Sequence, residues 1–403
     1  MYIYKVGVVG AGAMGAQIAQ VVTFAGLPVV LTDVSEAIAQ RGVETVRAIY
    51  QGRVERGKMT AEQREEKMLL ITAAGSLAAL RDVDLVIEAA PENLTLKQNV
   101  FRALEGACSP GAILASNTSA LSISALGAAT KRPGKVIGLH FFNPAYAMPL
   151  VEVIPGLATE QQTVEDAVGF AESLRKAPIV VKECAGFLVN RLLMPYLNEA
   201  VLCLQEGASS LKVIDQDMVA FGMPVGPFTL LDTIGNDISL EVARILHRSF
   251  GPRMAPAPLL EALVKAGRLG VKSGRGFYEY GGARDQELEG LIKKAGEAGG
   301  SRGTRWAPSR LLMAMVNEAA LALQEGVASA RDIDLAMVAG TGFPKDKEGP
   351  LHYADQLGIE KVLQDMEESA QRLGMRFWPA PMLRRMVDAG FTGRSAGRGF
   401  FTY

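Results

Sequence analysis

The sequence is poor in residues that cross-link small secreted domains or bind metal ions. Its 403 residues include three cysteines and three histidines. Cys108, Cys184 and Cys203 lie far apart and form no C-x-x-C pair, so neither a disulfide framework nor a thiolate metal site is expected. We interpret them as small buried residues of a protein in a reducing compartment, and expect a cytoplasmic location and no bound metal.

The sequence also lacks an excess of either charge and any long apolar run. The formal net charge is −1, whereas a general attraction to nucleic acid or anionic lipid needs a surplus of Lys and Arg. No apolar run reaches the roughly 18 residues that span a bilayer. The opening residues MYIYKVGVVGAGAMG have no basic region and run into a Gly-rich turn, as a strand does and a signal peptide does not. Neither nucleic acid nor a membrane is an expected partner.

The periodicity of the chain changes near residue 184. Before it, short β-branched runs alternate with helical stretches, as a parallel sheet covered on both faces requires. Beyond it, apolar residues recur at helical spacing, as in 187–206. The predicted fold is therefore an α/β domain followed by an all-α region. Seven strands are predicted, at 4–9, 28–32, 83–89, 112–116, 136–142, 150–154 and 178–182.

The helical region repeats itself. Residues 198–218 align with 317–337 at an offset of 119, and the phrase GRGFYEY at 274–280 returns as GRGFFTY at 397–403. Such self-similarity is typical of a duplicated domain, and two copies are too few for a solenoid. We expect four segments: an α/β domain at 1–184, a first helical copy at 185–281, a linker around one short helix at 282–304, and a second helical copy at 305–403.

A Gly-rich turn follows the first predicted strand and opens a helix. In GAGAMG, Gly10 permits a tight turn, Gly12 lets the backbone approach a pyrophosphate, and Gly15 allows close packing of helix and strand. Asp33, 23 residues after Gly10, is placed to accept hydrogen bonds from ribose hydroxyls. No arginine follows it at 34–36 to hold a 2′-phosphate, so NAD is favoured over NADP. The alternatives are FAD or no nucleotide, with the aspartate a simple turn residue.

One histidine stands at the end of a predicted strand. His140 lies in GLHFFNP, and Glu152 lies twelve residues later on the next strand-like run. Histidine titrates near neutral pH, which suits a base that takes the proton of an alcohol while hydride leaves its carbon. If the two strands are antiparallel neighbours, the carboxylate can fix the tautomer of the imidazole. On this pattern alone, a structural histidine is about as good an interpretation.

Several motifs together resemble the L-3-hydroxyacyl-CoA dehydrogenase family. They are GAGAMG with its aspartate, SNTSALSI, GLHFFNPAYAMPLVEVIPG, GFLVNRLLMPYLNEA, GMPVGPFTLLD and GRGFYEY. The similarity covers residues 1–280 nearly end to end, and the second helical copy again resembles the C-terminal domain of the family. The resemblance implies a Rossmann-type NAD-binding domain followed by two helical domains related by duplication.

The resemblance also implies roles for individual residues. His140 would be the general acid/base with Glu152 as its partner, Ser119 would hydrogen-bond the substrate oxygen, and Asn190 would bind the substrate carbonyl region. Further residues would complete the binding sites, namely Gly10, Gly12, Met14, Gly15, Asp33, Glu92, Lys97, Ser119 and Asn143 for the cofactor, and Lys58 for coenzyme A.

Structural alternatives stand beside these roles. Ser119 could cap a helix and Asn143, before a proline, could belong to a turn. Glu92 and Lys97 could form a solvated helix pair, and the charges around Lys58 could be a helix face in water. Asn190 is predicted to lie in mid-helix, where Asn is poorly favoured, which supports a function for it. Pro91 departs from the family pattern and is expected to shift the loop before Glu92.

The second helical copy keeps its scaffold but lacks the asparagine that is expected to bind substrate. At the same offset, Asn190 corresponds to Ser309 and Pro195 to Ala314, whereas Arg191 is retained as Arg310. We therefore expect one active site per chain and a non-catalytic second copy that packs on the first, imitating the homodimer contact of two-domain family members. The chain would then be a monomer or a homodimer. His247 and His352 do not align and are interpreted as structural.

These features lead to one expected reaction and two alternatives. The expected reaction is the reversible, NAD-dependent oxidation of an (S)-3-hydroxyacyl-CoA to the 3-ketoacyl-CoA. One alternative is the same chemistry on another 3-hydroxy acid, such as a sugar acid. The other is an NAD(H)-sensing protein without turnover. No hydratase-like segment precedes the dinucleotide-binding segment in the printed sequence, so the dehydrogenase activity alone is expected.

Overall fold

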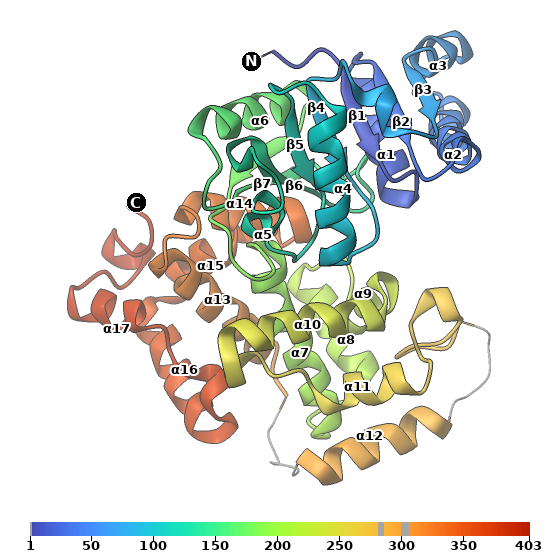
Figure 1. Ribbon diagram of the computed structural model, residues 1–403. Helices are drawn as coiled ribbons and strands as arrows, with labels where there is room; N and C mark the ends of the chain where they lie inside the picture. Colours follow the sequence, from blue (N-terminus) through green and yellow to red (C-terminus); the bar gives the residue numbers. More distant parts are fainter. Residues whose placement is uncertain (1, 281–285, 300–305) are drawn as a thin grey trace. The chain divides into compact units, whose positions relative to one another are not determined.

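The computed structural model describes residues 2–280, 286–299 and 306–403, which form two compact units divided after Phe187. The first unit is α/β and the second is helical (Figure 1). The prediction of a Rossmann-like sheet domain followed by a helical region is thus confirmed. Within the predicted linker, residues 286–299 form a helix, and 282–285 and 300–304 lie outside the described residues.

The first unit is built on one eight-stranded sheet with strand order β3-β2-β1-β4-β5-β6-β7-β8. All neighbouring strands run parallel except β6 and β7, which are antiparallel. Order 3-2-1-4-5-6 is that of dinucleotide-binding sheets, in which ligands bind at the carboxyl ends of the strands. The strands are β1 (Val6–Val9), β2 (Val29–Thr32), β3 (Ile71–Ala74), β4 (Leu85–Glu88), β5 (Ile113–Ser116), β6 (Val136–Phe141), β7 (Leu150–Pro155) and β8 (Ala177–Val180).

The sequence pattern predicted seven of these strands and missed β3. This strand reads ITAA, carries two alanines, and lies at the edge of the sheet with no residue fully buried. Alanine has little strand propensity, and the continuous apolar run of a central strand is not required at an edge. The signal for β3 was therefore weak.

Helices cover the sheet of the first unit, and several begin at side chains that cap them. Ser35 caps α2, Asn93 caps α4, and Thr60 with Gln63 forms a capping box on α3. These caps accept hydrogen bonds from backbone N–H groups of the first helical turn and so fix where each helix begins. The helices are α1 (Ala13–Phe24), α2 (Glu36–Glu55), α3 (Ala61–Met68), α4 (Leu94–Ala107), α5 (Ile123–Gly127) and α6 (Gln161–Ser173), with short 3-10 turns at Leu77–Leu80 and Pro133–Lys135.

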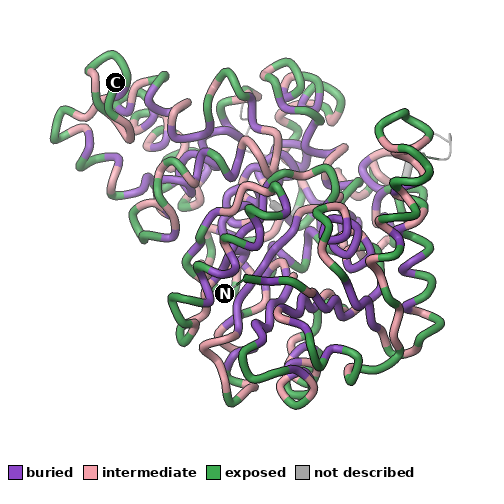
Figure 2. The backbone as a smooth tube through the Cα atoms, turned by 90° about the horizontal axis from the view of Figure 1, so that it is seen from above, coloured by how far each residue is buried: buried purple, intermediate pink, exposed green. Residues whose placement is uncertain are grey.

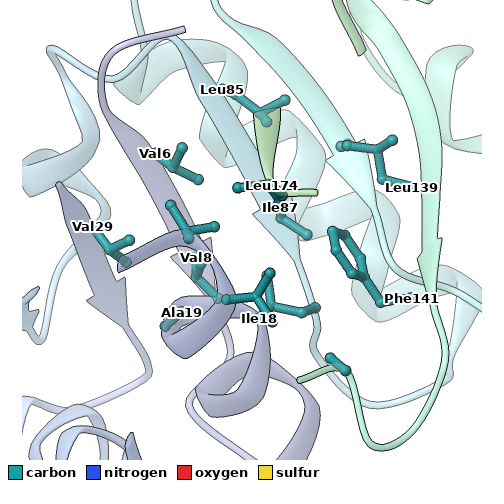
Figure 3. Close-up of a cluster of buried hydrophobic side chains, with 14 of the residues drawn as sticks. Val6, Val8, Ile18, Ala19, Val29, Leu85, Ile87, Leu139, Phe141 and Leu174 are labelled. Carbon is teal, nitrogen blue, oxygen red and sulfur yellow. The ribbon is translucent and has the colours of Figure 1, made fainter. Parts of the chain in front are cut away.

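The core of the first unit lies between the sheet and its helices. Ile18 and Ala19 of α1 pack with side chains of β1, β2, β4 and β6 (Figure 3). Every residue of β1 and β4 is buried, and buried backbone, purple in Figure 2, fills the interior. Cys108 is buried as expected, but Cys184 is only half-buried, because it lies in the segment that leaves the sheet domain.

The second unit is built of helices, and its described residues contain no strand beyond isolated bridges near the GRGFYEY and GRGFFTY phrases. Its helices are α7 (Val189–Gln205), α8 (Leu211–Phe221), α9 (Pro227–Ile234), α10 (Asn236–Phe250), α11 (Pro258–Lys265), α12 (Gln286–Gly299), α13 (Ser309–Gln324), α14 (Ala330–Thr341), α15 (Pro350–Leu357), α16 (Ile359–Leu373) and α17 (Pro381–Asp388), with 3-10 turns at Gly251–Met254, Val271–Ser273, Lys345–Lys347, Met375–Phe377 and Arg394–Ala396. In neither unit is any described helix both long and apolar enough to cross a bilayer.

Helices α7 and α13 pack against each other through reciprocal ion pairs. Arg191 of α7 donates to Glu318 at 2.7 Å and to Glu325 at 2.8 Å. Arg310 of α13 donates to Glu199 at 2.6 Å and to Glu206 at 2.8 Å. Each residue of one set stands 119 positions from its counterpart in the other, so the contact has the self-complementary form of a two-fold interface.

The phrases GRGFYEY and GRGFFTY are each held by one aspartate. Asp232 accepts from the backbone N–H groups of Phe277 and Tyr278, both at 2.8 Å, and from the Tyr280 hydroxyl at 3.0 Å. Asp355 accepts in the same way from the N–H groups and the hydroxyl of the second phrase, at 2.9 Å for Phe400, 3.0 Å for Phe401 and 3.0 Å for Tyr403. Each aspartate thereby ties a chain segment to its helices.

Candidate active site

The predicted site residues of the first unit follow the carboxyl ends of parallel strands. The Gly-rich turn follows β1, Asp33 follows β2, and Glu92 follows β4. Ser119 follows β5, and Asn143 follows β6, which carries His140 next to its last residue. Because parallel strands end at the same edge of a sheet, these residues belong to one edge.

The Gly-rich turn has the geometry that a pyrophosphate needs. Gly10 has φ of +98°, and a Cβ on Gly15 would stand 1.8 Å from the Gly10 carbonyl oxygen, so both positions require glycine. A Cβ on Gly12 would meet nothing within 4 Å, which leaves the backbone open. Helix α1 starts there without a side-chain cap or an acidic residue in its first turn, so its N–H groups can meet a phosphate.

Asp33 joins the second strand to this turn. One carboxylate oxygen accepts from the backbone N–H of Ala11 at 2.7 Å, and the other accepts from Val34 N–H at 2.7 Å. Each oxygen has a second lone pair, so the side chain can still accept hydrogen bonds from two ribose hydroxyls. Met14, in the first turn of α1, is half-buried against the sheet core.

His140 and Glu152 face each other across β6 and β7. The antiparallel register places them opposite, and His140 Nδ1 lies 2.7 Å from Glu152 Oε2. The glutamate is completely buried, and the histidine residue is 6% exposed. The His140 ring also contacts Phe142 and Phe187, with ring centroids 4.5 and 5.9 Å away. A carboxylate at Nδ1 favours the tautomer with Nδ1–H, which leaves Nε2 able to accept a proton.

Glu92 organises the loop after β5. Its carboxylate accepts from the Thr118 hydroxyl at 2.5 Å and from the Ser119 backbone N–H at 3.0 Å, and its Oε1 lies 3.3 Å from Ser119 Oγ. The loop with Pro91 thus presents Glu92 to SNTS. The structure brings Glu92 and Ser119 together, although neither their spacing nor their residue types indicated a contact.

Lys97 is buried, which excludes the interpretation of a solvated helix pair. Its residue is 1% exposed, and its ammonium donates to Glu88 at 2.7 Å and to the Ala90 carbonyl at 2.9 Å. Glu88, also buried, accepts in addition from the Ser116 hydroxyl at 2.6 Å. Sequence reasoning missed Glu88. A carboxylate ending the apolar strand LVIE was the available signal, since buried charges are expected to be paired.

Asn143 is joined to helix α1. Its side-chain oxygen accepts from Gln17 Nε2 at 3.2 Å, and Gln17 Oε1 accepts from the backbone N–H of Ala145 at 2.7 Å. The following loop is also held by Lys176, whose ammonium donates to the Ala145 and Met148 carbonyls. Burial lowers the pKa of Lys176. Sequence reasoning missed Gln17, because no pattern of the sequence connects helix α1 with this loop.

Two predicted substrate residues lie apart from these contacts in the sequence. Asn190 is the second residue of α7, so it lies in the first helical turn and not in mid-helix as predicted. The helix starts later than its apolar periodicity suggested, and asparagine is better tolerated near a helix start. Lys58 follows the end of α2 and has an exposed side chain.

Among the residues the structure describes, no cluster of three or more acidic, His or Cys side chains could hold a metal ion.

Comparison with known families agrees with the order of a dinucleotide-binding sheet domain and a helical region. The NAD-binding domain of 3-hydroxyacyl-CoA dehydrogenase matches residues 5–184, and the C-terminal domain of the same enzymes matches both 186–280 and 306–403. The chain belongs to the 3-hydroxyacyl-CoA dehydrogenase family. The family's N-terminal domain binds NAD, so the cofactor predicted from Gly10 and Asp33 is confirmed at the level of the family.

Several known proteins are similar to this chain over all or part of their length. A crystal structure of 3-hydroxybutyryl-CoA dehydrogenase from Escherichia coli K12 shares 32% identity, covers 97% of this chain and 100% of its own, and has a TM-score of 0.87. The (S)-3-hydroxybutyryl-CoA dehydrogenase of Ralstonia eutropha is 42% identical over 70% of this chain and all of its own, with a TM-score of 0.68. The fatty acid oxidation complex subunit alpha of Shewanella amazonensis is 39% identical over 96% of this chain, which spans 56% of that subunit.

Proposed function

We propose that the chain catalyses the reversible, NAD-dependent oxidation of (S)-3-hydroxyacyl-CoA to 3-ketoacyl-CoA. The observation that carries this proposal is the buried pair of His140 and Glu152, 2.7 Å apart beside the edge that carries the dinucleotide turn. Similar chains are named as 3-hydroxybutyryl-CoA dehydrogenases, which supports a thioester substrate.

In the proposed reaction His140 takes the hydroxyl proton of the substrate at Nε2. Glu152 holds the ring through Nδ1, which orients it and stabilises the imidazolium that forms. Its complete burial strengthens this interaction, since little water screens it. NAD, when bound, supplies the acceptor for the hydride, which leaves the carbon that carries this hydroxyl group. In the reverse direction, His140 returns the proton to the carbonyl oxygen.

Two donors would bind the reacting part of the substrate. We assign the reacting oxygen to the Ser119 hydroxyl and the thioester end to Asn190. Glu92 accepts from the Ser119 backbone N–H at 3.0 Å, which would hold this loop in place, and the Ser119 hydroxyl would turn its proton from Glu92 to the substrate oxygen. Donors fixed before the reaction contribute most where charge develops.

On the cofactor side we assign the pyrophosphate to the turn Gly10–Gly15, which includes Gly12 and Met14, and the ribose to Asp33. Asn143 and Glu92 would face the nicotinamide end. Lys97 donates to Glu88 and to the Ala90 carbonyl, so we propose that it fixes the position of the loop that carries Glu92. Lys58, exposed after α2, remains the proposed contact for the phosphates of coenzyme A.

Substitution of the histidine tests the proposed catalyst. His140→Gln is expected to lower turnover about 100-fold or more, because a general base contributes about 10²–10⁴-fold, while NADH binding is retained. His247→Gln, at a histidine interpreted as structural and given no part in the reaction, is the control. Near-wild-type turnover in His140→Gln would refute the assignment.

The substrate class needs a separate measurement. NADH oxidation is compared with acetoacetyl-CoA, longer 3-ketoacyl-CoA thioesters and free 3-keto acids. We expect turnover of the thioesters. Activity restricted to free acids would favour the sugar-acid alternative, and NADH binding without any turnover would favour a sensing protein.

We propose further that the two helical segments arose by duplication and pack as a pseudo-dimer within the chain. The family's C-terminal domain matches both segments, and Arg191 and Arg310 make corresponding ion pairs. Solution mass measured for the wild type and for Arg310→Met tests this. An internal contact leaves the number of chains per assembly unchanged, whereas a contact exchanged between two chains would make that number fall.

A further inference from the structure

The loop that follows β6, the strand of His140, is joined to helix α1 by the Gln17 side chain. Gln17 lies on α1, two residues after the last glycine of the dinucleotide turn. Its Oε1 accepts from the Ala145 backbone N–H at 2.7 Å, and its Nε2 donates to Asn143 Oδ1 at 3.2 Å. The side chain thus joins the helix that faces the pyrophosphate to the loop that faces the nicotinamide end.

These two hydrogen bonds determine which way both amides point. A backbone N–H can only donate, so the Gln17 atom that faces Ala145 must be its oxygen. The Gln17 atom that faces Asn143 is therefore the NH₂ group, which has no acceptor capacity. Asn143 must meet it with Oδ1. Its own NH₂ group then points away from Gln17. Since amide orientations are assigned from such networks, this unambiguous backbone donor settles both.

We propose that Gln17 is a positioning residue that sets the polarity of the Asn143 amide toward the cofactor. The inference rests on the proposed function, which places Asn143 at the nicotinamide end. With Oδ1 engaged by Gln17, Asn143 offers a donor to that end, and the carboxamide oxygen of nicotinamide is the acceptor that matches it.

The orientation is set by contacts within the protein. Asn143 is exposed, and an exposed amide would otherwise rotate freely between its two settings. Gln17 is half-buried on a helix, and the loop is fixed from its other side by Lys176, which donates to the Ala145 and Met148 carbonyls at 2.6 and 2.8 Å. Binding therefore does not need to order this group, and the entropy of ordering it is not lost on binding.

The substitution Gln17→Glu turns the amide without changing the size of the side chain. Both carboxylate oxygens accept hydrogen bonds, so one still meets Ala145 N–H and the other requires a donor. Asn143 must then rotate and present Oδ1 to the cofactor. Nicotinamide can respond by turning its carboxamide to donate from NH₂. The acetyl group of 3-acetylpyridine adenine dinucleotide has no N–H and cannot.

The measured quantity is the ratio of the dissociation constants of 3-acetylpyridine adenine dinucleotide and NAD. We expect Gln17→Glu to raise this ratio about tenfold at about pH 8, where glutamate is ionised. In the variant, the acetyl oxygen of the analogue meets Asn143 Oδ1, so two acceptors face each other and the hydrogen bond is lost. NAD avoids this loss by turning its carboxamide. Repulsion between the new carboxylate and the pyrophosphate acts on both ligands and cancels in the ratio. Turnover is not needed for this measurement.

Matched variants separate orientation from general damage. Asn143→Asp, which offers only acceptors, is expected to raise the ratio as Gln17→Glu does. In an Asn143→Ala background, Gln17→Glu should leave the ratio unchanged. Gln17→Met releases the amide without turning it and is expected to give a smaller rise. It takes the place of Gln17→Glu if that variant does not fold.

An unchanged ratio in Gln17→Glu, or a rise that persists in the Asn143→Ala background, overturns the inference. Failure of the proposed function looks different, because the wild type would bind both dinucleotides and turn over no 3-hydroxyacyl-CoA. A wild-type chain that binds neither dinucleotide would contradict both.

Discussion

The two helical halves, residues 188–280 and 306–403, agree where side chains hold backbone groups. Asn198 bonds the Ala255 carbonyl and the Ala257 N–H, and Asn317 bonds the corresponding groups of Trp378 and Ala380. The reciprocal arginines and the aspartates that hold the GRGF phrases agree as well. An unsatisfied buried backbone group is costly, so these positions tolerate little change.

The halves differ where one donor can replace another. In the first half, Asp215 accepts from the hydroxyls of Thr229 and Tyr278 at 2.8 and 2.9 Å. In the second, His352 Nδ1 lies 2.7 Å from Asp334, and its ring stacks on Phe401 with 3.6 Å between centroids. The carboxylate keeps a partner in both. The comparison teaches that the acceptor is required, whereas the identity of its donor varies.

The reciprocal ion pairs give the largest expected effect. Arg191→Met and Arg310→Met should each lower the free energy of unfolding by about 3 kcal/mol, because a buried glutamate loses its main partner. Arg253 and Arg376 also contact Glu318 and Glu199 and retain part of the pairing. Urea denaturation at neutral pH measures both variants. A large loss in only one of them would show that the two halves are not equivalent here.

The aspartates that hold the GRGF phrases come next. Asp232→Asn and Asp355→Asn should each cost about 2–3 kcal/mol of unfolding free energy, since an amide turns a donor toward a backbone N–H. Asp232→Asn is expected to cost more, because Asp232 also accepts from Asn236 at 3.0 Å. Thermal unfolding compares the two variants. A greater cost in the second half would contradict this ranking.

Substitution of Asn190 and of its counterpart Ser309 should affect activity differently in the two halves. Asn190→Ala is expected to lower kcat/KM for a 3-hydroxyacyl-CoA about 10–100-fold, the loss of one or two hydrogen bonds in the transition state. Ser309→Ala, its matched control, should change kcat/KM less than about twofold, as a surface change without a role in the site. Similar losses in both variants would disprove the single active site proposed for each chain.

The smallest expected effect is a pH dependence of the second half. Burial raises the pKa of Asp334 to about 6, well above the usual value of an aspartate in water. The folded state therefore binds this proton more tightly than the unfolded state, so its stabilising contribution is present at low pH and is lost as the pH rises through about 6.

Asp334→Asn should remove this dependence. Between about pH 4 and pH 7, we expect the unfolding free energy of the wild type to fall by about 2 kcal/mol relative to the variant, because a pKa of about 6 lies well above the ordinary value of an aspartate. Asp355, whose pKa is also raised by burial, is retained in both proteins. Unfolding free energies across this pH range test it, and a difference that does not vary with pH would contradict it.

Sequence reasoning predicted the parts of the molecule that depend on local pattern. Continuous apolar runs predicted seven strands, and the turn at Gly10 predicted the NAD-binding family, because backbone and packing constraints there admit few residue types. β3 and the start of α7 were misjudged, since two alanines carry little strand signal and apolar periodicity continues past a helix end. These errors arose where local preference is weak.

The sequence by itself determined seven of the strands, the change to a helical region, the dinucleotide turn and the repeat of the helical half. Only the tertiary structure decided that Gln17 meets Asn143, and that Lys97 is buried against Glu88. Such contacts join residues on different elements through the register of the sheet and the packing of helices on it. Periodicity describes which face of an element is buried, but not which polar side chains of two distant elements will meet.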